Sequence, residues 1–161
     1  MLTTLTAPAF AGTWYIENGD ITVKAGDTEG TNKVKQGDSD FVKDEGDTII
    51  TGTSNQNTVT IETEKKDDKV EVTLKDVKIE ASSRNEAAVS VTGKGDTNIE
   101  LDGDNKLQSG SGHAGLEHNK TDTSGELTIQ DNDKNGSLKA AGGQYGAGIG
   151  GAGAANDAQV K

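Results

Sequence analysis

The chain of 161 residues has a single-domain length and no cysteine, which excludes a disulfide framework. Its formal net charge is -11 and its one arginine is Arg84, so cations or neutral polymers fit better as partners than nucleic acid or an anionic membrane. Hydrophobic residues make up 30% and aromatic residues 3% of the chain, and the mean hydropathy is -0.69. Such a composition indicates disorder unless each strand needs only one or two inward residues.

The N-terminal segment has features of an export signal. Residues 1–11 end in Ala9-Phe10-Ala11, an A-x-A pattern that is typical of a signal-peptidase site. The charged beginning and the full apolar segment of a signal peptide are missing, so we interpret residues 1–11 as a remnant; the alternative is an ordinary apolar strand. Export predicts an extracellular or cell-surface location. Membrane insertion is not expected, because no segment reaches the roughly 20 apolar residues of a transmembrane helix.

Residues 12–46 do not show the repeat that follows them, and we expect an N-terminal cap or an irregular first coil there. Trp14 and Tyr15 are adjacent, so in a strand their side chains point to opposite sides. One ring would then cover the open end of a stack, and the other would face water. Trp14 is therefore a candidate capping residue and also a candidate for stacking on a sugar ring.

A repeated apolar pattern determines the predicted fold. Pairs of apolar residues two apart recur, each followed by a short polar run: Val72/Leu74, Ile99/Leu101 and Leu127/Ile129. Leu101 follows Leu74 by 27 residues, and Ile129 follows Leu101 by 28. A unit of nearly constant length is the signature of a solenoid, in which equivalent residues stack about 4.8 Å apart as aliphatic ladders.

Each unit also repeats its internal order of strands. The second apolar position is predicted at Ile79, Leu107 and Leu138, the third at Val89, Leu116 and Ile149, and upstream Ile50 fits the second while Val59 and Ile61 fit the third. The segments between them are rich in Asn, Asp, Gly and Ser, which turn the chain. We predict an all-β fold over residues 47–161, a right-handed parallel β-helix (β-solenoid) with three short strands per coil of roughly 27–31 residues. The alternatives are disorder and a β-sandwich.

The predicted corner after the first strand of each coil is rich in oxygen ligands. Five residues occupy equivalent corners of two successive coils: Asp102, Asp104, Asp131, Asp133 and Asn135. Such a cluster either repels or holds a hard cation, and calcium is the natural occupant, so these residues are the predicted site of a structural calcium ion. The alternative is a set of solvated turns. An EF-hand is not predicted, because the closing glutamate and the flanking helices are missing.

The Gly-rich run near the C-terminal end carries a resemblance to a known family. Residues 145–151 read Tyr-Gly-Ala-Gly-Ile-Gly-Gly, and strand-then-turn phrases precede them at 72–77 and 99–105. These segments resemble the repeats of secreted bacterial surface proteins described as carbohydrate-binding-domain-like, which are right-handed parallel β-helices. The resemblance spans residues 47–151. It implies a non-catalytic role in polysaccharide binding or adhesion, and it offers no binding residues to carry over.

The same run contains the second candidate ligand contact. Glycines surround Tyr145 and leave its ring accessible to a ligand, although packing against those glycines is the alternative. A phosphate-binding loop is not predicted, because the run lacks the Gly-Lys-Ser/Thr that must follow it. The sequence stops where another coil would begin, so we expect a C-terminally truncated solenoid whose uncapped last coil permits edge-to-edge association of copies.

These observations predict a non-catalytic, extracellular carbohydrate-binding or adhesion module with a polysaccharide or a host or cell-surface glycan as its partner. One alternative is a structural β-helical stalk without its own ligand. A third reading is a calcium-dependent polysaccharide lyase-like enzyme, since such enzymes also use parallel β-helices. A lyase needs a base beside the metal, and Arg84 lies on a different predicted corner from the acidic cluster. No catalytic residue is therefore predicted.

Overall fold

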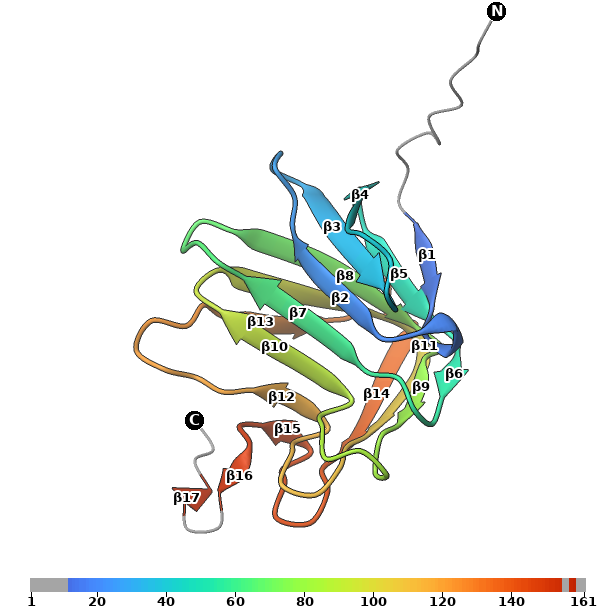
Figure 1. The fold of residues 1–161 in the computed structure, drawn as a ribbon, viewed down its shortest axis with the longest axis vertical. Helices are drawn as coiled ribbons and strands as arrows, with labels where there is room; N and C mark the ends of the chain where they lie inside the picture. The colour runs from blue at the N-terminus through green and yellow to red at the C-terminus, as the bar shows by residue number, and fades with distance from the viewer. Residues whose placement is uncertain (1–11, 155–156, 159–161) are drawn as a thin grey trace, which may run out of the picture.

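The computed structural model describes residues 12–154 and 157–158, and the predicted signal-peptide remnant at 1–11 lies outside them. The chain forms an all-β solenoid of about three turns in which strands of successive coils stack in parallel (Figure 1). The predicted fold class is confirmed. Among the described residues the single helical element is a short 3-10 turn, η1 (Ile16–Asn18), so no helix there is long and apolar enough to cross a membrane.

Three sheets form the walls of the solenoid. Sheet A consists of β1 (Thr13–Tyr15), β5 (Thr48–Thr51), β8 (Lys69–Lys75), the first half of β11 (Asp96–Gln108) and β13 (Leu127–Gln130). Sheet C consists of β6 (Thr53–Ser54), β9 (Lys78–Glu80), the second half of β11 and β14 (Gly136–Ala141). The parallel part of sheet B consists of β2 (Ile21–Ala25), β7 (Val59–Thr63), β10 (Val89–Gly93), β12 (Leu116–His118) and β15 (Ile149–Gly150). Figure 1 shows sheet B in front of sheet A, with sheet C closing one side.

Aliphatic ladders fill the interior, as the repeat predicted. Ile99 pairs with Val72 and Leu101 with Leu74 in sheet A, and Leu107 pairs with Ile79 in sheet C. In sheet B the ladder contains Val59, Val89, Leu116 and Ile149 in register. Side chains alternate across each strand, so these residues share the inward face of their sheet and their neighbours share the outward face.

The predicted register is wrong in the last coil. Leu127 was expected opposite Ile99 and Ile129 opposite Leu101, but Ile129 pairs with Ile99, 30 residues earlier. In sheet C, Ala140 rather than Leu138 pairs with Leu107, 33 residues earlier. The offset between paired residues grows from 30 in sheet A to 33 in sheet C. The corner between β13 and β14 is therefore three residues longer than the equivalent corner within β11. A slip of two residues leaves every side chain on the same face, so alternation alone does not reveal it.

The upstream assignment of Ile50 is also corrected. Ile50 was predicted at the second strand position, but it pairs with Leu74 in sheet A and therefore occupies the first. Val59 and Ile61 pair with Val89 and Val91 in sheet B, which confirms their third position.

An antiparallel hairpin adds to sheet B at the N-terminal end of the stack. β3 (Thr31–Gln36) pairs with β2, and β4 (Val42–Glu45) pairs with β3. Buried polar side chains lie beneath it. Asp44 accepts hydrogen bonds from the Gly12 N–H at 2.7 Å and from the Thr48 hydroxyl at 3.0 Å, while the Asn32 amide donates to Thr48 at 2.8 Å. The hairpin thus closes this end of the core through hydrogen bonds.

At the opposite end, the last coil covers its inward residues less completely. Leu127, Ile129 and Leu138 are only partly buried against the core, and Ile149 is 48% exposed. A short antiparallel pair, β16 (Gly153–Ala154) and β17 (Asp157–Ala158), follows β15. The predicted edge-to-edge association of copies stays a prediction.

Candidate functional site

The outer face of sheet C presents in-register polar rows from successive coils. Because Ile79 and Leu107 point into the core, their neighbours point outward. Lys106 pairs with Lys78 above and with Lys139 below, so three lysines stack directly on one another. We call these three residues the lysine row. Thr53 continues the row in β6, where it pairs with Lys78.

An open groove of about 560 Å³ lies against this face, between the strands and the loop that joins β6 to β7. Eight of the eleven residues that line it carry an amide or a charged group: Asn55, Gln56, Asn57, Gln108, Lys78, Lys106, Glu17 and Glu80. Amide side chains offer both donors and acceptors, and lysines offer three donors each. The groove can therefore hydrogen-bond a ligand that is rich in hydroxyl groups.

The corner between sheets A and C fixes where these strands begin. Asp76 has φ 49°, and the paired corner residue in the next coil is Gly103 with φ 65°. A Cβ on Gly103 would lie 2.0 Å from the Asp76 Oδ1 atom, so a larger residue there would require the Asp76 side chain to move and would strain the backbone. The Asp76 carboxylate accepts the Asp104 N–H at 2.9 Å.

A buried amide completes this corner. Asn105 is 2% exposed, and its Oδ1 accepts the Val77 N–H at 3.0 Å. Its Nδ2 donates to the carbonyl oxygens of Asp102 and Ser137, each at 3.2 Å. One side chain therefore joins three successive coils immediately before the lysine row.

Arg84 anchors the loop between β6 and β7, which forms one wall of the groove. The Arg84 guanidinium donates to the Gln56 carbonyl at 2.5 Å and to Asp20 at 3.0 Å, and it pairs with Glu86 at 2.7 Å. Partial burial lowers the pKa of Arg84, but the Glu86 and Asp20 carboxylates outweigh burial and raise it. Arg84 thus stays charged and ties the loop that carries Gln56 to the neighbouring coils.

One of the two acidic residues that line the groove, Glu80, is held by a turn. The Ser82 N–H donates to the Glu80 carboxylate at 2.9 Å. Hydrogen bonding from Ser82 is the main cause that lowers the pKa of Glu80, and the Lys106 charge adds a smaller lowering effect. Glu80 is therefore ionised at neutral pH beside the central lysine of the row.

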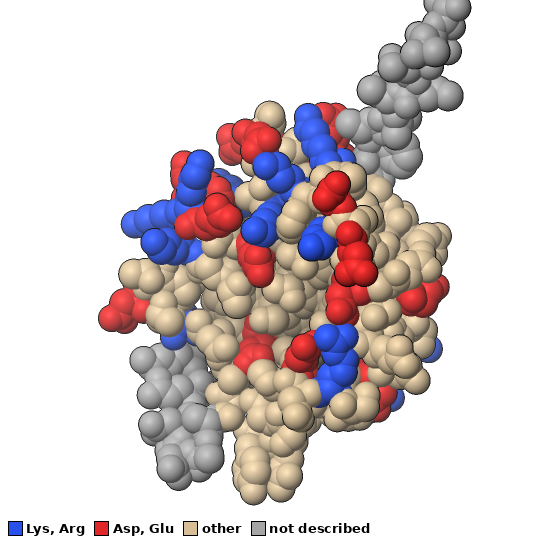
Figure 2. Space-filling model, viewed as in Figure 1, with Lys and Arg blue, Asp and Glu red and all other residues tan. Residues whose placement is uncertain are grey.

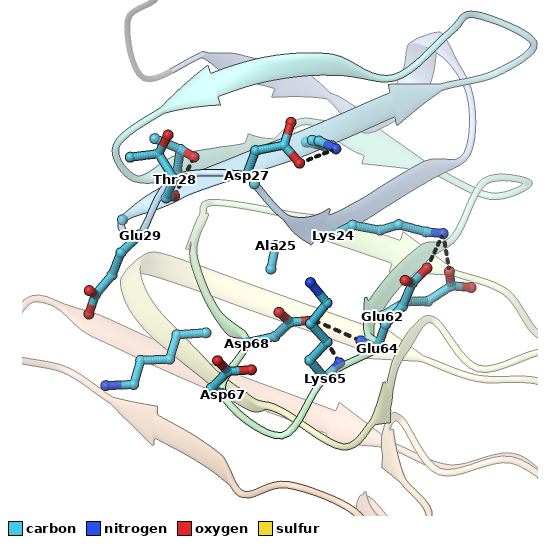
Figure 3. A pocket seen from close by; sticks show the side chains of 15 residues that line it. Lys24, Ala25, Asp27, Thr28, Glu29, Glu62, Glu64, Lys65, Asp67 and Asp68 are labelled. Carbon is cyan, nitrogen blue, oxygen red and sulfur yellow. Dashed lines mark hydrogen bonds and ion pairs between the residues drawn. The ribbon is translucent and has the colours of Figure 1, made fainter.

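A second pocket of about 590 Å³ lies at the loop ends of β2 and β7, and five of its ten charged side chains form ion pairs with one another (Figure 3). Lys24 points to Glu62 and Glu64, each at 3.5 Å, and Asp68 accepts the backbone N–H groups of Glu64 and Lys65 at 2.9 Å. Figure 2 shows acidic and basic side chains intermingled over this upper part of the face, around β2 and β3. The groove on sheet C is the stronger candidate.

The two predicted aromatic ligand residues have different surroundings. Trp14 is partly buried against the core, and its indole N–H donates to Asp44 at 2.9 Å beneath the hairpin. Tyr145 is 73% exposed in the loop between β14 and β15, with φ 67°. The structure brings neither ring into the groove, and their roles in binding stay predictions.

Several side chains of the predicted calcium corner form hydrogen bonds within the protein. Asp131 accepts the N–H groups of Asn135 at 3.1 Å and Gly136 at 3.2 Å, and the Asn135 amide donates to Asp102 at 3.1 Å. The corner therefore brings these side chains together across two coils.

The other two members of the predicted calcium set lie nearby. Ser137 donates to Asp104 at 2.8 Å, and Asp133 is exposed. Within residues 12–154 and 157–158, no group of three His, Cys, Asp or Glu side chains is arranged to hold a metal ion. Calcium binding stays a prediction.

Comparison of the chain with known protein families, curated proteins and solved structures found no match.

Proposed function

We propose that this chain is a non-catalytic polysaccharide-binding module whose binding surface is the groove on the outer face of sheet C. The observation that carries the proposal is the convergence of amide and lysine side chains from three successive coils on one open groove. A polysaccharide chain is extended and rich in hydroxyl groups, so it matches a groove that offers many hydrogen-bonding groups along a rigid surface.

The rigidity of this surface supports binding. Sheet C is fixed from inside by Ile79 and Leu107, at the sheet A corner by Asn105, and at the loop by Arg84. Side chains held on a fixed backbone lose less conformational entropy when a ligand binds. The proposal of an extracellular location rests on the Ala9-Phe10-Ala11 pattern and on the resemblance of residues 145–151 to secreted bacterial proteins.

The test is retention of the purified chain on a panel of insoluble and immobilised polysaccharides, with calcium and with a chelator. Wild type should be retained selectively by at least one polysaccharide. Gln108→Ala combined with Asn55→Ala should weaken that retention, because both amides line the groove. The matched control combines Lys69→Ala with Glu29→Ala in the other pocket and should bind like wild type.

The panel also separates the alternatives. Failure of the folded chain to bind every polysaccharide would contradict the proposal and favour a structural stalk. Release of soluble sugar fragments during incubation would instead favour a lyase-like enzyme. Retention that disappears with chelator would show that calcium contributes to binding, and it would direct the next variants to Asp102 and Asp131.

A further inference from the structure

The lysine row is one of two in-register lysine rows on the described part of the solenoid, but each lysine of the other row forms an ion pair. In sheet B, Lys33 lies between Lys24 and Lys43, and these three lysines pair with Asp27, Glu62 and Glu45, respectively. In sheet B, Lys24 lies beside Glu62 in the next coil, and in sheet A, Lys75 lies beside Asp102. In sheet C, Lys78, Lys106 and Lys139 stack on one another in register. Like charges directly opposite each other on a sheet are destabilising, so the row has a cost that the fold itself does not require.

The flanking carboxylates do not neutralise the row directly. Glu80 accepts a hydrogen bond from Ser82, and Asp104 accepts one from Ser137. Within the part of the chain that the structure describes, none of the three lysines forms an ion pair. All three are exposed, so their ammonium groups are available to a ligand.

We propose that the lysine row binds the sulfate or phosphate ester groups of an anionic polysaccharide, an inference that rests on the proposed polysaccharide-binding function. The row places ammonium-bearing side chains at intervals of about 4.8 Å, the spacing between strands. Two of its members, Lys78 and Lys106, also line the groove, so an anionic chain in the groove would meet them.

The lysine side chains are compatible with a tetrahedral anion. Arginine presents a planar fork that pairs bidentately with carboxylate and phosphate alike, whereas lysine is a compact point charge with three donors that also binds phosphate. Tetrahedral sulfate and phosphate esters direct their oxygens in several directions and suit such point charges. The net charge of -11 repels polyanions in general, so selective binding of one would report a local site rather than overall attraction.

The experiment compares four polymers with one backbone: dextran, carboxymethyl-dextran, dextran sulfate and dextran phosphate. The wild-type chain should bind dextran sulfate or dextran phosphate more tightly than the other two, and binding should weaken as salt rises. Comparing dextran sulfate with dextran phosphate shows which of the two ester groups the row binds. The row variant Lys78→Gln, Lys106→Gln and Lys139→Gln should lose at least about tenfold in affinity.

The matched control, Lys66→Gln, Lys94→Gln and Lys120→Gln, removes the same charge from other exposed lysines and should bind like wild type. Thermal melting without ligand checks that both variants fold. Equal binding of all four polymers, or equal loss in both variants, would overturn the inference. If wild type binds a neutral polysaccharide of the wider panel but neither dextran sulfate nor dextran phosphate, the inference fails while the proposed function stands. If no polysaccharide binds, both fail.

Discussion

The side-chain oxygen of Asn105 accepts a hydrogen bond from the backbone N–H of Val77 in the preceding coil at 3.0 Å. Both groups are buried, so the amide replaces a strand partner at the place where the chain turns from sheet A to sheet C. The same side chain donates to Ser137 in the following coil. The corner is therefore held by one residue whose loss would leave backbone groups of two neighbouring coils without partners.

Asn105→Ala should lower the free energy of unfolding by about 1–3 kcal/mol, because it leaves the buried Val77 N–H unsatisfied. Asn98→Ala in the same strand is the control. Asn98 is partly exposed and should change stability by less than about 0.5 kcal/mol. Denaturant titration measures both. Equal stability of the two variants would show that the amide is not needed at the corner.

The ladder in sheet A should be unevenly sensitive to truncation. Leu74 lies between Ile50 and Leu101, so Leu74→Ala should cost about 2–5 kcal/mol. Leu101 has Leu74 on one side, but β13 ends opposite Glu100, and Leu101 is 8% exposed. Leu101→Ala should therefore cost clearly less than Leu74→Ala. The reverse order of melting temperatures would support the originally predicted register, with Ile129 opposite Leu101.

Asp44 should stabilise the N-terminal end of the solenoid. Its carboxylate accepts hydrogen bonds from Gly12, Trp14 and Thr48, and Asp44→Ala leaves these three donors without their acceptor. We expect a loss of at least about 2 kcal/mol in the free energy of unfolding. The exposed Asp40→Ala is the control and should behave like wild type.

The single tryptophan of the chain gives a direct signal for the Asp44 prediction. Because Trp14 donates to Asp44, its fluorescence should shift toward that of exposed indole in Asp44→Ala at temperatures where the rest of the solenoid is folded. An unchanged spectrum together with unchanged stability would contradict the proposed closing role of Asp44.

Low pH should weaken the loop between β2 and β3, because it protonates Asp27. Lys33 donates a hydrogen bond to Asp27 at 2.8 Å, and this bond and the lysine charge hold the pKa of the carboxyl below its ordinary value. A depressed pKa in the folded state stabilises the protein above the unfolded-state pKa, and this contribution disappears as pH falls through the folded-state value. NMR titration should show the pKa of Asp27 rising in Lys33→Gln. An unchanged pKa would mean that the pair does not persist in solution.

The apolar repeat was sufficient to predict the solenoid and most of its stacking. Val72 with Ile99 and Val89 with Leu116 follow from spacing alone, because their coils have nearly equal lengths. The longer corner at 131–135 broke that assumption. The pairing of Leu138 with Asn105 rather than Leu107 could not be recognised from alternation, which a two-residue slip preserves.

The candidate site was harder to predict. Lys78 and Lys106 precede ladder residues, so their stacking was implied by the repeat, but Lys139 required the corrected register. Asn105 and Asp44 were missed as structural residues because buried and turn-forming Asn and Asp look alike in a polar sequence. The charge of the groove depends on which outward residues share a row, and that depends on register.

The most direct test of the central claim is NMR mapping of the polysaccharide that the chain retains, added as soluble oligosaccharides to the labelled protein. We predict that shift changes concentrate on the groove, at the side-chain amides of Gln108 and Asn55 and at the neighbouring Lys106. Changes centred instead on Tyr145, or on the pocket around Lys24, would contradict the assignment of the binding surface to sheet C.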